Sequence, residues 1–306
     1  MIDICVGHTA HAVYCIWVIN LNEMEPDIIT NRTKDLTADE KDKLEEQNKR
    51  LVPEFKANKL EIDAQRHWDL FYKRNETRFF KDRHWTTREF QELLADQASA
   101  ATGPQEKRTL LEVGCGVGNL VFPLLEEQIK EETNAGFYFY ACDFSPRAVE
   151  FVRSNSLYDT KHITAFQCDI TSEQVHEHIA PESLDVCTMI FVLSAIHPDK
   201  FKAVIANLAK LLKPGGLVLF RDYGLYDMAQ LRFKPGHKIA ENLYMRQDGT
   251  RSYYFAEQEL AQLFNDSDFE VISNNYVHRR TLNLKEGIDV PRIFLQGKFR
   301  KRIKSQ

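Results

Sequence analysis

From about residue 107 onward, short apolar segments alternate with segments in which apolar residues recur every three or four positions. The apolar segments predict strands at 109–113, 137–142, 163–167, 184–191 and 216–221. The amphipathic segments predict helices at 119–129, 146–154, 172–178, 199–212 and 257–265. Alternating strands and helices are typical of a parallel sheet with helices packed on both faces. Two further β-rich segments, 269–278 and 291–299, can pair as an antiparallel edge. The pattern therefore predicts a doubly wound, mostly parallel α/β domain at 107–302.

The residues before this domain predict helices rather than strands. A capping box at 37–40 predicts a charged helix that reaches about Leu51. Pro53 suits the first turn of a second helix, which we expect to continue to Tyr72 with its apolar residues on one face. We therefore predict a helical N-terminal extension at 37–106, including a linker into the domain.

An insertion at 223–256 separates the last parallel strand from the helix predicted at 257–265. Two aromatic-rich runs, 241–246 and 251–255, flank an Asp-Gly pair, and this arrangement predicts a β-hairpin. A hairpin above the catalytic edge of such a sheet often contacts substrate. A flap that only packs against the domain is the alternative.

The turn after the first strand carries the strongest signal for a ligand. Its sequence is acidic-x-Gly-x-Gly-x-Gly, with the acidic residue at Glu112 and glycines at Gly114, Gly116 and Gly118. Glycines suit a backbone that must pass under a ligand with no Cβ in the way. The dinucleotide fingerprint G-x-G-x-x-G places its third glycine one residue later. The spacing resembles that of S-adenosylmethionine-dependent methyltransferases, and a glycine-rich turn without a ligand is the alternative.

Residues at the ends of the next three strands are suited to an adenosine group. Asp143 can accept hydrogen bonds from both ribose hydroxyls, and it can also cap the helix that follows. Asp169 and Ile170 can hold the amine and one face of the adenine ring. Ile190 can cover the other face of the ring.

The candidate catalytic residues follow the fifth strand: Asp222, Tyr223 and Arg221. An acceptor ring nitrogen with a free lone pair needs no strong base for methyl transfer. A carboxylate such as Asp222 would then stabilise the growing positive charge and accept from an exocyclic amine. Tyr223 or Phe80 could stack on an extruded base. The alternative is an ion pair between Arg221 and either Asp222 or Asp227.

The sequence lacks the motifs of several other kinds of site. Six cysteines without a C-x-x-C pair indicate reduced thiols, and without Cys/His spacing typical of metal ligands we predict no metal. No Asp-Pro-Pro-Tyr or Asn-Pro-Pro-Tyr box follows the fourth strand, and His197 is expected to be a loop or cap residue. The apolar run at 10–21 is too short to span a bilayer and lacks a basic flank, so we expect 1–36 to be a disordered or leader segment. The net charge of −5 still allows a local basic face for nucleic acid.

Five motifs together are similar to those of the eukaryotic tRNA N3-methylcytidine methyltransferases, class I enzymes that modify cytidine 32 of the anticodon loop. The motifs are WDLFYKRN at 68–75, FFKDRHW at 79–85, the turn at 112–119, ACDFSP at 141–146 and FRDYG at 220–224. The resemblance covers about residues 45–300. Within the family the chain most resembles the short cytosolic member that acts on serine tRNAs together with seryl-tRNA synthetase.

The resemblance implies S-adenosylmethionine as cofactor and assigns further residues to the site. Trp68 and Tyr72 would close over the cofactor, beside the glycine turn and the adenosine-binding residues. A tRNA-binding platform would include Lys73, Arg74, Phe80, Lys81, Arg83, His84, Arg246, Arg251 and Arg300. The alternative for such charged runs is a solvated face, although interleaved aromatic residues favour RNA.

We therefore expect a monomeric, cytoplasmic enzyme that binds tRNA and seryl-tRNA synthetase and no membrane, with the nucleus as a second location. Two other readings stay open at this point. One is methylation of a protein or small molecule. The other is a non-catalytic module that binds cofactor and supports a tRNA–synthetase complex.

Overall fold

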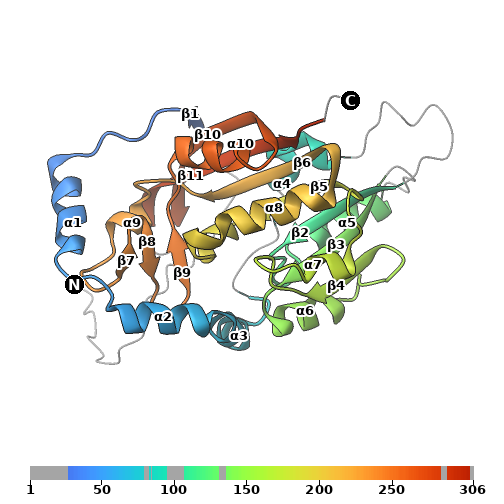
Figure 1. Cartoon of the computed structure of the whole chain (residues 1–306), viewed down its shortest axis with the longest axis horizontal. Coiled ribbons are helices and arrows are strands. Elements are labelled where there is room, and N and C mark those ends of the chain that lie inside the picture. Colours follow the sequence, from blue (N-terminus) through green and yellow to red (C-terminus); the bar gives the residue numbers. More distant parts are fainter. Residues whose placement is uncertain are drawn as a thin grey trace, which may run out of the picture.

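The computed structural model describes residues 27–78, 83, 85–94, 107–130, 136–283 and 288–303. Its centre is an eight-stranded sheet with the order β1-β10-β11-β6-β5-β2-β3-β4 (Figure 1). The strands are β1 (Ile28–Thr30), β2 (Arg108–Val113), β3 (Phe137–Asp143), β4 (Ile163–Gln167), β5 (Leu184–Ile190), β6 (Leu212–Tyr223), β10 (Phe269–Asn283) and β11 (Ile288–Lys301). Neighbouring strands from β6 to β4 are parallel, whereas β11 is antiparallel to β6 and β10 is antiparallel to β11. The predicted mostly parallel sheet with an antiparallel edge is confirmed.

Helices cover both faces of the sheet (Figure 1). One face packs against α7 (Val175–His178), α8 (Phe201–Leu211) and α10 (Glu257–Asn265). The other face packs against α5 (Val121–Lys130), α6 (Pro146–Arg153), α4 (Trp85–Glu89) and η1 (Gln91–Leu93). The strand order reverses between β2 and β5, and ligands of such sheets bind at the carboxyl ends of the strands at this point.

The region before the domain contains α1 (Ala38–Asn48), α2 (Glu54–Ile62) and α3 (Ala64–Asn75). The predicted capping box is present at the start of α1. The Thr37 hydroxyl accepts from the Glu40 amide at 3.3 Å, and the Glu40 carboxylate accepts from the Thr37 amide at 3.1 Å.

The prediction of one continuous helix from Pro53 to Tyr72 is wrong, because the chain breaks at Asp63 between α2 and α3. Asp63 leaves the helical conformation (φ −88°, ψ 10°), as expected of a residue type that favours turns over helix interiors. On α2, Phe55 and Ile62 are exposed, at 76% and 82%. Only α3 buries its aromatic face against the domain.

The expected leader at 1–36 also needs correction, because β1 belongs to the catalytic sheet. Ile28, Ile29 and Thr30 pair antiparallel with Tyr276–His278 of β10. Residues 1–26 lie outside the described residues. A three-residue strand whose partner follows some 250 positions later carries no local pattern from which it could be predicted.

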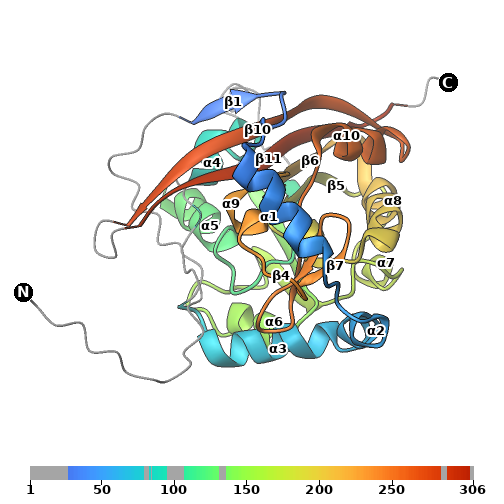
Figure 2. The same cartoon turned by 90° about the vertical axis from the view of Figure 1, so that its left-hand side faces the viewer.

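The insertion forms the predicted hairpin. β8 (Leu243–Met245) pairs antiparallel with β9 (Arg251–Tyr253), and β7 (Lys238–Ala240) adds a third strand. The short helix α9 (Met228–Leu231) precedes them. The turn at Gly249 (φ +84°) packs directly on His67 of α3, where an added Cβ would lie 2.3 Å from the imidazole Nδ1. Figure 2 shows α2 and α3 running along the same side of the molecule as this small sheet and α6.

Candidate active site

A pocket lies at the carboxyl ends of β2, β3, β4 and β5, and α3 covers it. Six of the predicted cofactor-binding residues line it: Trp68, Tyr72, Gly114, Asp143, Asp169 and Ile170. The fold thus brings together residues from α3 and from the ends of three strands. In the described part of the chain, no group of three or more metal-ligating side chains is found.

Two glycines of the turn allow close contacts: Gly116 with Tyr72 of α3, and Gly118 with Phe122 of α5. Gly114 and Gly116 have φ of +60° and +56°, which favours glycine. A Cβ on Gly116 would lie 3.0 Å from the Tyr72 hydroxyl, so the absent side chain leaves room for Tyr72 beside the pocket. A Cβ on Gly118 would lie 2.4 Å from the Phe122 ring. Gly118 therefore serves the packing of α5 on the turn.

Asp143 joins two turns at the wall of the pocket. One carboxylate oxygen accepts from the Ser145 amide and the other from the Gly116 amide, each at 2.9 Å. Burial raises the pKa of Asp143 to about 6, against the effect of these hydrogen bonds. The cap of α6 is Ser145, whose hydroxyl accepts from the Ala148 amide, so the alternative role of Asp143 as helix cap is wrong.

Ile190 does not line the pocket. Its side chain is 1% exposed and packs in the core on the α5 face of the sheet. The chain turns at Phe191, which has φ of +61°, a conformation uncommon for a side chain of this size. This turn brings Phe191, Val192 and Ile196 to the pocket wall instead. Backbone strain of this kind often marks a functional site, and it is not visible in the sequence.

Asp222 is fully buried and holds the loop that follows β5. One of its oxygens accepts from the Ser194 amide and the other from the Tyr223 amide, each at 2.9 Å. Burial raises the pKa of Asp222 to about 6, while the hydrogen bonds from Ser194 oppose this. The loop held by Asp222 contains η2 (Leu193–Ala195) and supplies several residues of the pocket wall.

Tyr223 lies in a cluster of aromatic and charged side chains next to the pocket. Its ring centroid is 5.2 Å from that of Phe191 and 5.7 Å from that of Tyr254. The guanidinium carbons of Arg246 and Arg292 lie 5.3 and 5.8 Å from the same ring. Phe191 belongs both to this cluster and to the pocket wall, so the cluster lies next to the pocket.

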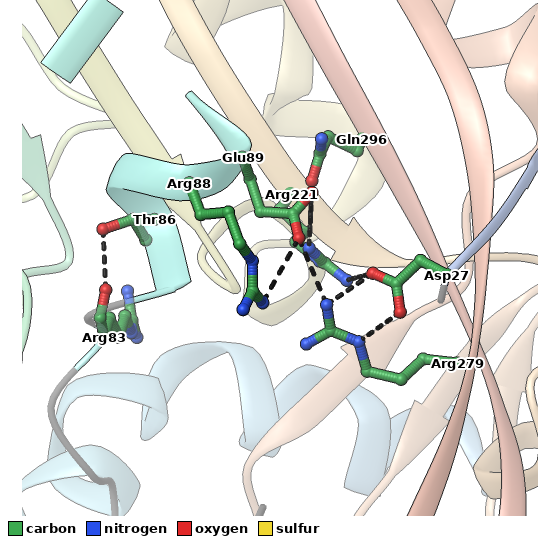
Figure 3. A network of polar contacts seen from close by, with 8 residues as sticks. All are labelled: Asp27, Arg83, Thr86, Arg88, Glu89, Arg221, Arg279 and Gln296. Carbon is green, nitrogen blue, oxygen red and sulfur yellow. Dashed lines mark hydrogen bonds and ion pairs between the residues drawn. The ribbon is translucent and has the colours of Figure 1, made fainter. Parts of the chain in front are cut away.

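Arg221 and Asp222 are consecutive residues of β6, so their side chains point to opposite faces of the strand. Arg221 takes part in a buried charge network (Figure 3). Its guanidinium carbon lies 4.6 Å from the Trp85 ring, and its Nη1 donates to Gln296 Oε1 at 3.0 Å. Its acidic partners are Asp27 and Glu89, each at 4.0 Å, so the alternative pairing with Asp222 or Asp227 is wrong. Asp227 instead pairs with Arg292 at 2.9 Å.

The predicted tRNA-binding residues occupy different environments. Lys73 and Arg74 are exposed on the last turn of α3. Arg300 is exposed and paired with Glu270 at 3.0 Å, whereas Arg251 is buried. Arg83 points inward, with its Nη1 3.2 Å from the Ile190 carbonyl oxygen. Phe80, Lys81 and His84 lie outside the described residues.

Several pocket residues were not predicted as site residues. Glu61, Lys200, His197 and Phe144 line the pocket together with Arg251, which was predicted only as a tRNA contact. His197 is also a cap, as predicted, since its Nδ1 accepts from the Asp199 amide at 3.4 Å. The position of Phe144 directly after Asp143 was a usable signal. Glu61 and Lys200 reach the pocket only through the tertiary fold.

The fold matches known methyltransferases. Residues 82–274 match a family model described as a methyltransferase domain. An S-adenosylmethionine-dependent methyltransferase structure from Anabaena variabilis aligns with a TM-score of 0.53 at 14% identity, covering 78% of this chain and 95% of that one. A structure concerned with conversion of a disulfide bond into a thioacetal group during echinomycin biosynthesis also aligns at 0.53, with 15% identity over 79% of this chain and 94% of that one. Fold and pocket define a class I S-adenosylmethionine-dependent methyltransferase.

Proteins of similar sequence identify the family within this class. The tRNA N(3)-cytidine methyltransferase METTL6 of Homo sapiens is 57% identical over 266 residues, covering 87% of this chain and 90% of the relative. METTL2 of Danio rerio is 41% identical, covering 84% and 79%, and trm140 of Schizosaccharomyces pombe is 40% identical, covering 84% and 80%. The chain belongs to the tRNA N(3)-cytidine methyltransferase family, which confirms the predicted family.

The pocket fits S-adenosylmethionine, the cofactor of this class. The backbone of Gly114 and the buried carboxylate of Asp143 line this pocket and suit an adenosine group with its two ribose hydroxyls. Asp169 and Ile170 line the same pocket at the end of β4.

Proposed function

We propose that this protein transfers a methyl group from S-adenosylmethionine to N3 of a cytidine in tRNA, at position 32 of the anticodon loop of serine tRNAs. The observation that carries the proposal is the shared position of Phe191. It lies between a pocket suited to the cofactor and a cluster of aromatic and charged residues suited to a base. The names of the relatives support the choice of base and of tRNA.

The residues of the pocket would bind and enclose the cofactor, which when bound supplies an electrophilic methyl group. Asp143 would accept from the ribose hydroxyls, and Asp169 and Ile170 would hold the adenine ring. Trp68 and Tyr72 would exclude water from the opposite side, since both rings lie on the buried face of α3. Positioning in a water-poor site is the main contribution that methyl transfer to a neutral nitrogen requires.

The acceptor cytosine would lie next to Phe191, where the cofactor pocket meets the Tyr223 cluster. N3 carries a free lone pair, so the base needs no deprotonation before attack. Asp222 would stabilise the positive charge that develops on the ring and accept from the 4-amino group. Its carboxylate accepts from the Ser194 and Tyr223 amides and from the Ser194 side chain, and a carboxylate has about four acceptor positions in all. Tyr223 would stack on the base, with Arg246 above its ring. Arg221 would act from the far side of β6 by holding α4 in place.

Basic residues around the opening would contact the tRNA backbone. Lys73 and Arg74 are exposed beside the pocket on α3, and we extend the proposal to Phe80, Lys81 and His84 on sequence grounds. Seryl-tRNA synthetase is the proposed partner of a monomeric, cytoplasmic or nuclear enzyme. No helix in the described residues is long and apolar enough to cross a membrane.

The test is a methyl-transfer assay with purified protein, S-adenosylmethionine and total tRNA, with and without seryl-tRNA synthetase. The tRNA is digested and its nucleosides are identified by mass spectrometry. Nuclease-protected fragments of the tRNA show which position is modified. We expect 3-methylcytidine at position 32 of serine tRNAs, and more of it with the synthetase. Binding of S-adenosylhomocysteine without any 3-methylcytidine would refute the proposed acceptor.

A further inference from the structure

Three separate parts of the chain meet at the mouth of the cofactor pocket through one carboxylate. Glu61 is in the last turn of α2, Lys200 ends η3 (Pro198–Lys200) just before α8, and Arg251 begins β9 of the insertion. We call these three residues the Glu61 cluster. All three line the pocket that contains Gly114 and Asp143. The cluster therefore connects the N-terminal helices, the methyltransferase domain and the hairpin across one opening.

The geometry assigns a separate cation to each oxygen of Glu61. Its Oε1 lies 2.5 Å from Lys200 Nζ, and its Oε2 accepts from Arg251 Nη1. Arg251 also donates from Nη2 to the Ala195 carbonyl oxygen at 3.3 Å, in the loop held by Asp222. Burial acts to raise the pKa of Glu61, but hydrogen bonds from Lys200 and Arg251 outweigh it and lower the pKa overall. Glu61 is therefore an anion at neutral pH.

The helix that follows Glu61 covers the cofactor pocket. Asp63 joins α2 to α3, and α3 carries Trp68 and Tyr72 over the pocket. The hairpin turn packs on His67 of the same helix. A cofactor that is consumed in every turnover must leave as product and be replaced. The Glu61 cluster lies at the edge of this cover, along the path of that exchange.

We propose that Glu61 is a positioning residue that holds α2 and α3 closed over the cofactor, and that breaking the Glu61 cluster limits release of S-adenosylhomocysteine. Arg251 belongs to the hairpin that carries Arg246. The contact between Glu61 and Arg251 therefore also positions the part of the site that would bind the acceptor base. The proposal depends on the cofactor pocket and is independent of which base accepts the methyl group.

The test compares Glu61→Gln with the wild-type protein in a stopped-flow chase of bound S-adenosylhomocysteine, without RNA. Glutamine keeps the size of the side chain and removes its charge, and its single carbonyl oxygen can accept from only one of the two cations. We expect the dissociation rate to rise about tenfold, because one charged hydrogen bond becomes neutral and the other is lost. Increasing salt should accelerate release from the wild type and leave the variant nearly unchanged, since salt screens the ion pairs. Lys200→Gln should give a smaller increase of the same kind.

Glu173→Gln is the matched control. It removes an ion pair of similar length, 2.9 Å to Lys210, from an exposed site away from the cofactor pocket. Its dissociation rate and salt dependence should equal those of the wild type. If Glu61→Gln and Lys200→Gln also release product at the wild-type rate, the proposal is overturned and the cluster only stabilises the fold. Failure of the proposed tRNA activity would leave this binding result intact, so the two proposals fail separately.

Discussion

The guanidinium of Arg83 lies beneath the glycine turn, with its Nη1 3.7 Å from Glu112 Oε1. Glu112 is 1% exposed, and its other oxygen accepts from the Val121 amide at the start of α5. A residue just before α4 thus contacts the acidic residue of the motif that shapes the cofactor pocket. Arg83 was predicted to bind tRNA, and in the structure it joins the N-terminal region to this turn.

Glu112 should make the stability of the protein depend on pH. Burial raises its pKa from 4.5 to about 8 in the folded state, although Arg83 opposes the shift. The folded state therefore holds a proton that the unfolded state loses near pH 4.5. The stability that this proton contributes is complete below that pH and is lost as the pH rises to about 8, on the order of a few kcal/mol. Glu112→Gln should flatten this decline.

Denaturant unfolding of both proteins between pH 5 and 8.5 would check this expectation. Asp143 and Asp222 also have raised pKa values, each about 6, and contribute in both proteins. The difference between the two curves therefore isolates Glu112. If the unfolding free energies of the two proteins change with pH in the same way, Glu112 is ionised in the folded state.

The glycines of the turn should separate cofactor binding from folding. Gly116→Ala places a methyl group 3.0 Å from the Tyr72 hydroxyl at a φ of +56°. We expect several-fold weaker binding of S-adenosylhomocysteine, from strain of about 1 kcal/mol and a displaced Tyr72. Gly118→Ala places its methyl group 2.4 Å from Phe122. It should mainly lower the melting temperature, because Phe122 must move within the core.

Calorimetric titration and thermal unfolding of both variants give the two readouts. The expectation is wrong if Gly118→Ala weakens binding more than Gly116→Ala while keeping the melting temperature of the wild type.

Asp222 should control the pH dependence of the chemical step. With a pKa of about 6, its carboxylate forms as the pH rises through that value. Single-turnover methylation at saturating cofactor should therefore increase from pH 5 to 7. Asp222→Asn should lower the rate by roughly 100-fold or more and remove this increase. Affinity for S-adenosylhomocysteine should stay within about twofold, since Asp222 does not line the cofactor pocket. A variant that methylates at near the wild-type rate would limit Asp222 to holding the loop after β5.

Arg221 should matter for stability rather than for binding the cofactor. Its side chain is 1% exposed, and burial together with Arg279 lowers its pKa to about 10. Arg221→Met leaves Asp27 and Glu89 with less compensating charge, and we expect a loss of about 2–4 kcal/mol of unfolding free energy. Arg300→Met, which removes an exposed ion pair, should cost about 1 kcal/mol or less. Equal stability of the two variants would contradict the role of the buried network in Figure 3.

The sequence predicted those features that depend on local pattern. The parallel strands, the hairpin, the glycine turn and the cap of α1 each follow from residues close together in the chain. Asp143 and Asp169 were found because the ends of parallel strands meet at one edge of the sheet. The position of Ile190 was predicted incorrectly, because the left-handed turn at Phe191 changes which side chain faces the pocket.

Contacts between distant segments could not be predicted. Glu61 and Arg251 are 190 positions apart, and nothing in either segment indicates the other. The same holds for Arg221, whose acidic partners come from the residue before β1 and from α4. Charge alone could not distinguish exposed basic residues from buried ones, and for this reason Lys73 and Arg83 were predicted to have the same role.

The pairing of Asp27 with Arg279 has a consequence for how the chain is made. The two residues are 252 positions apart, and among the described strands β1, beside Asp27, pairs with β10 alone. At a translation rate of roughly 5–20 residues per second, about 13–50 s pass between their appearance on the ribosome. Throughout that time Ile28 and Ile29 have no strand to join, and a chain that terminates before β10 never supplies one. The outer edge of the sheet is thus completed only after β10 has been made and pairs with β1.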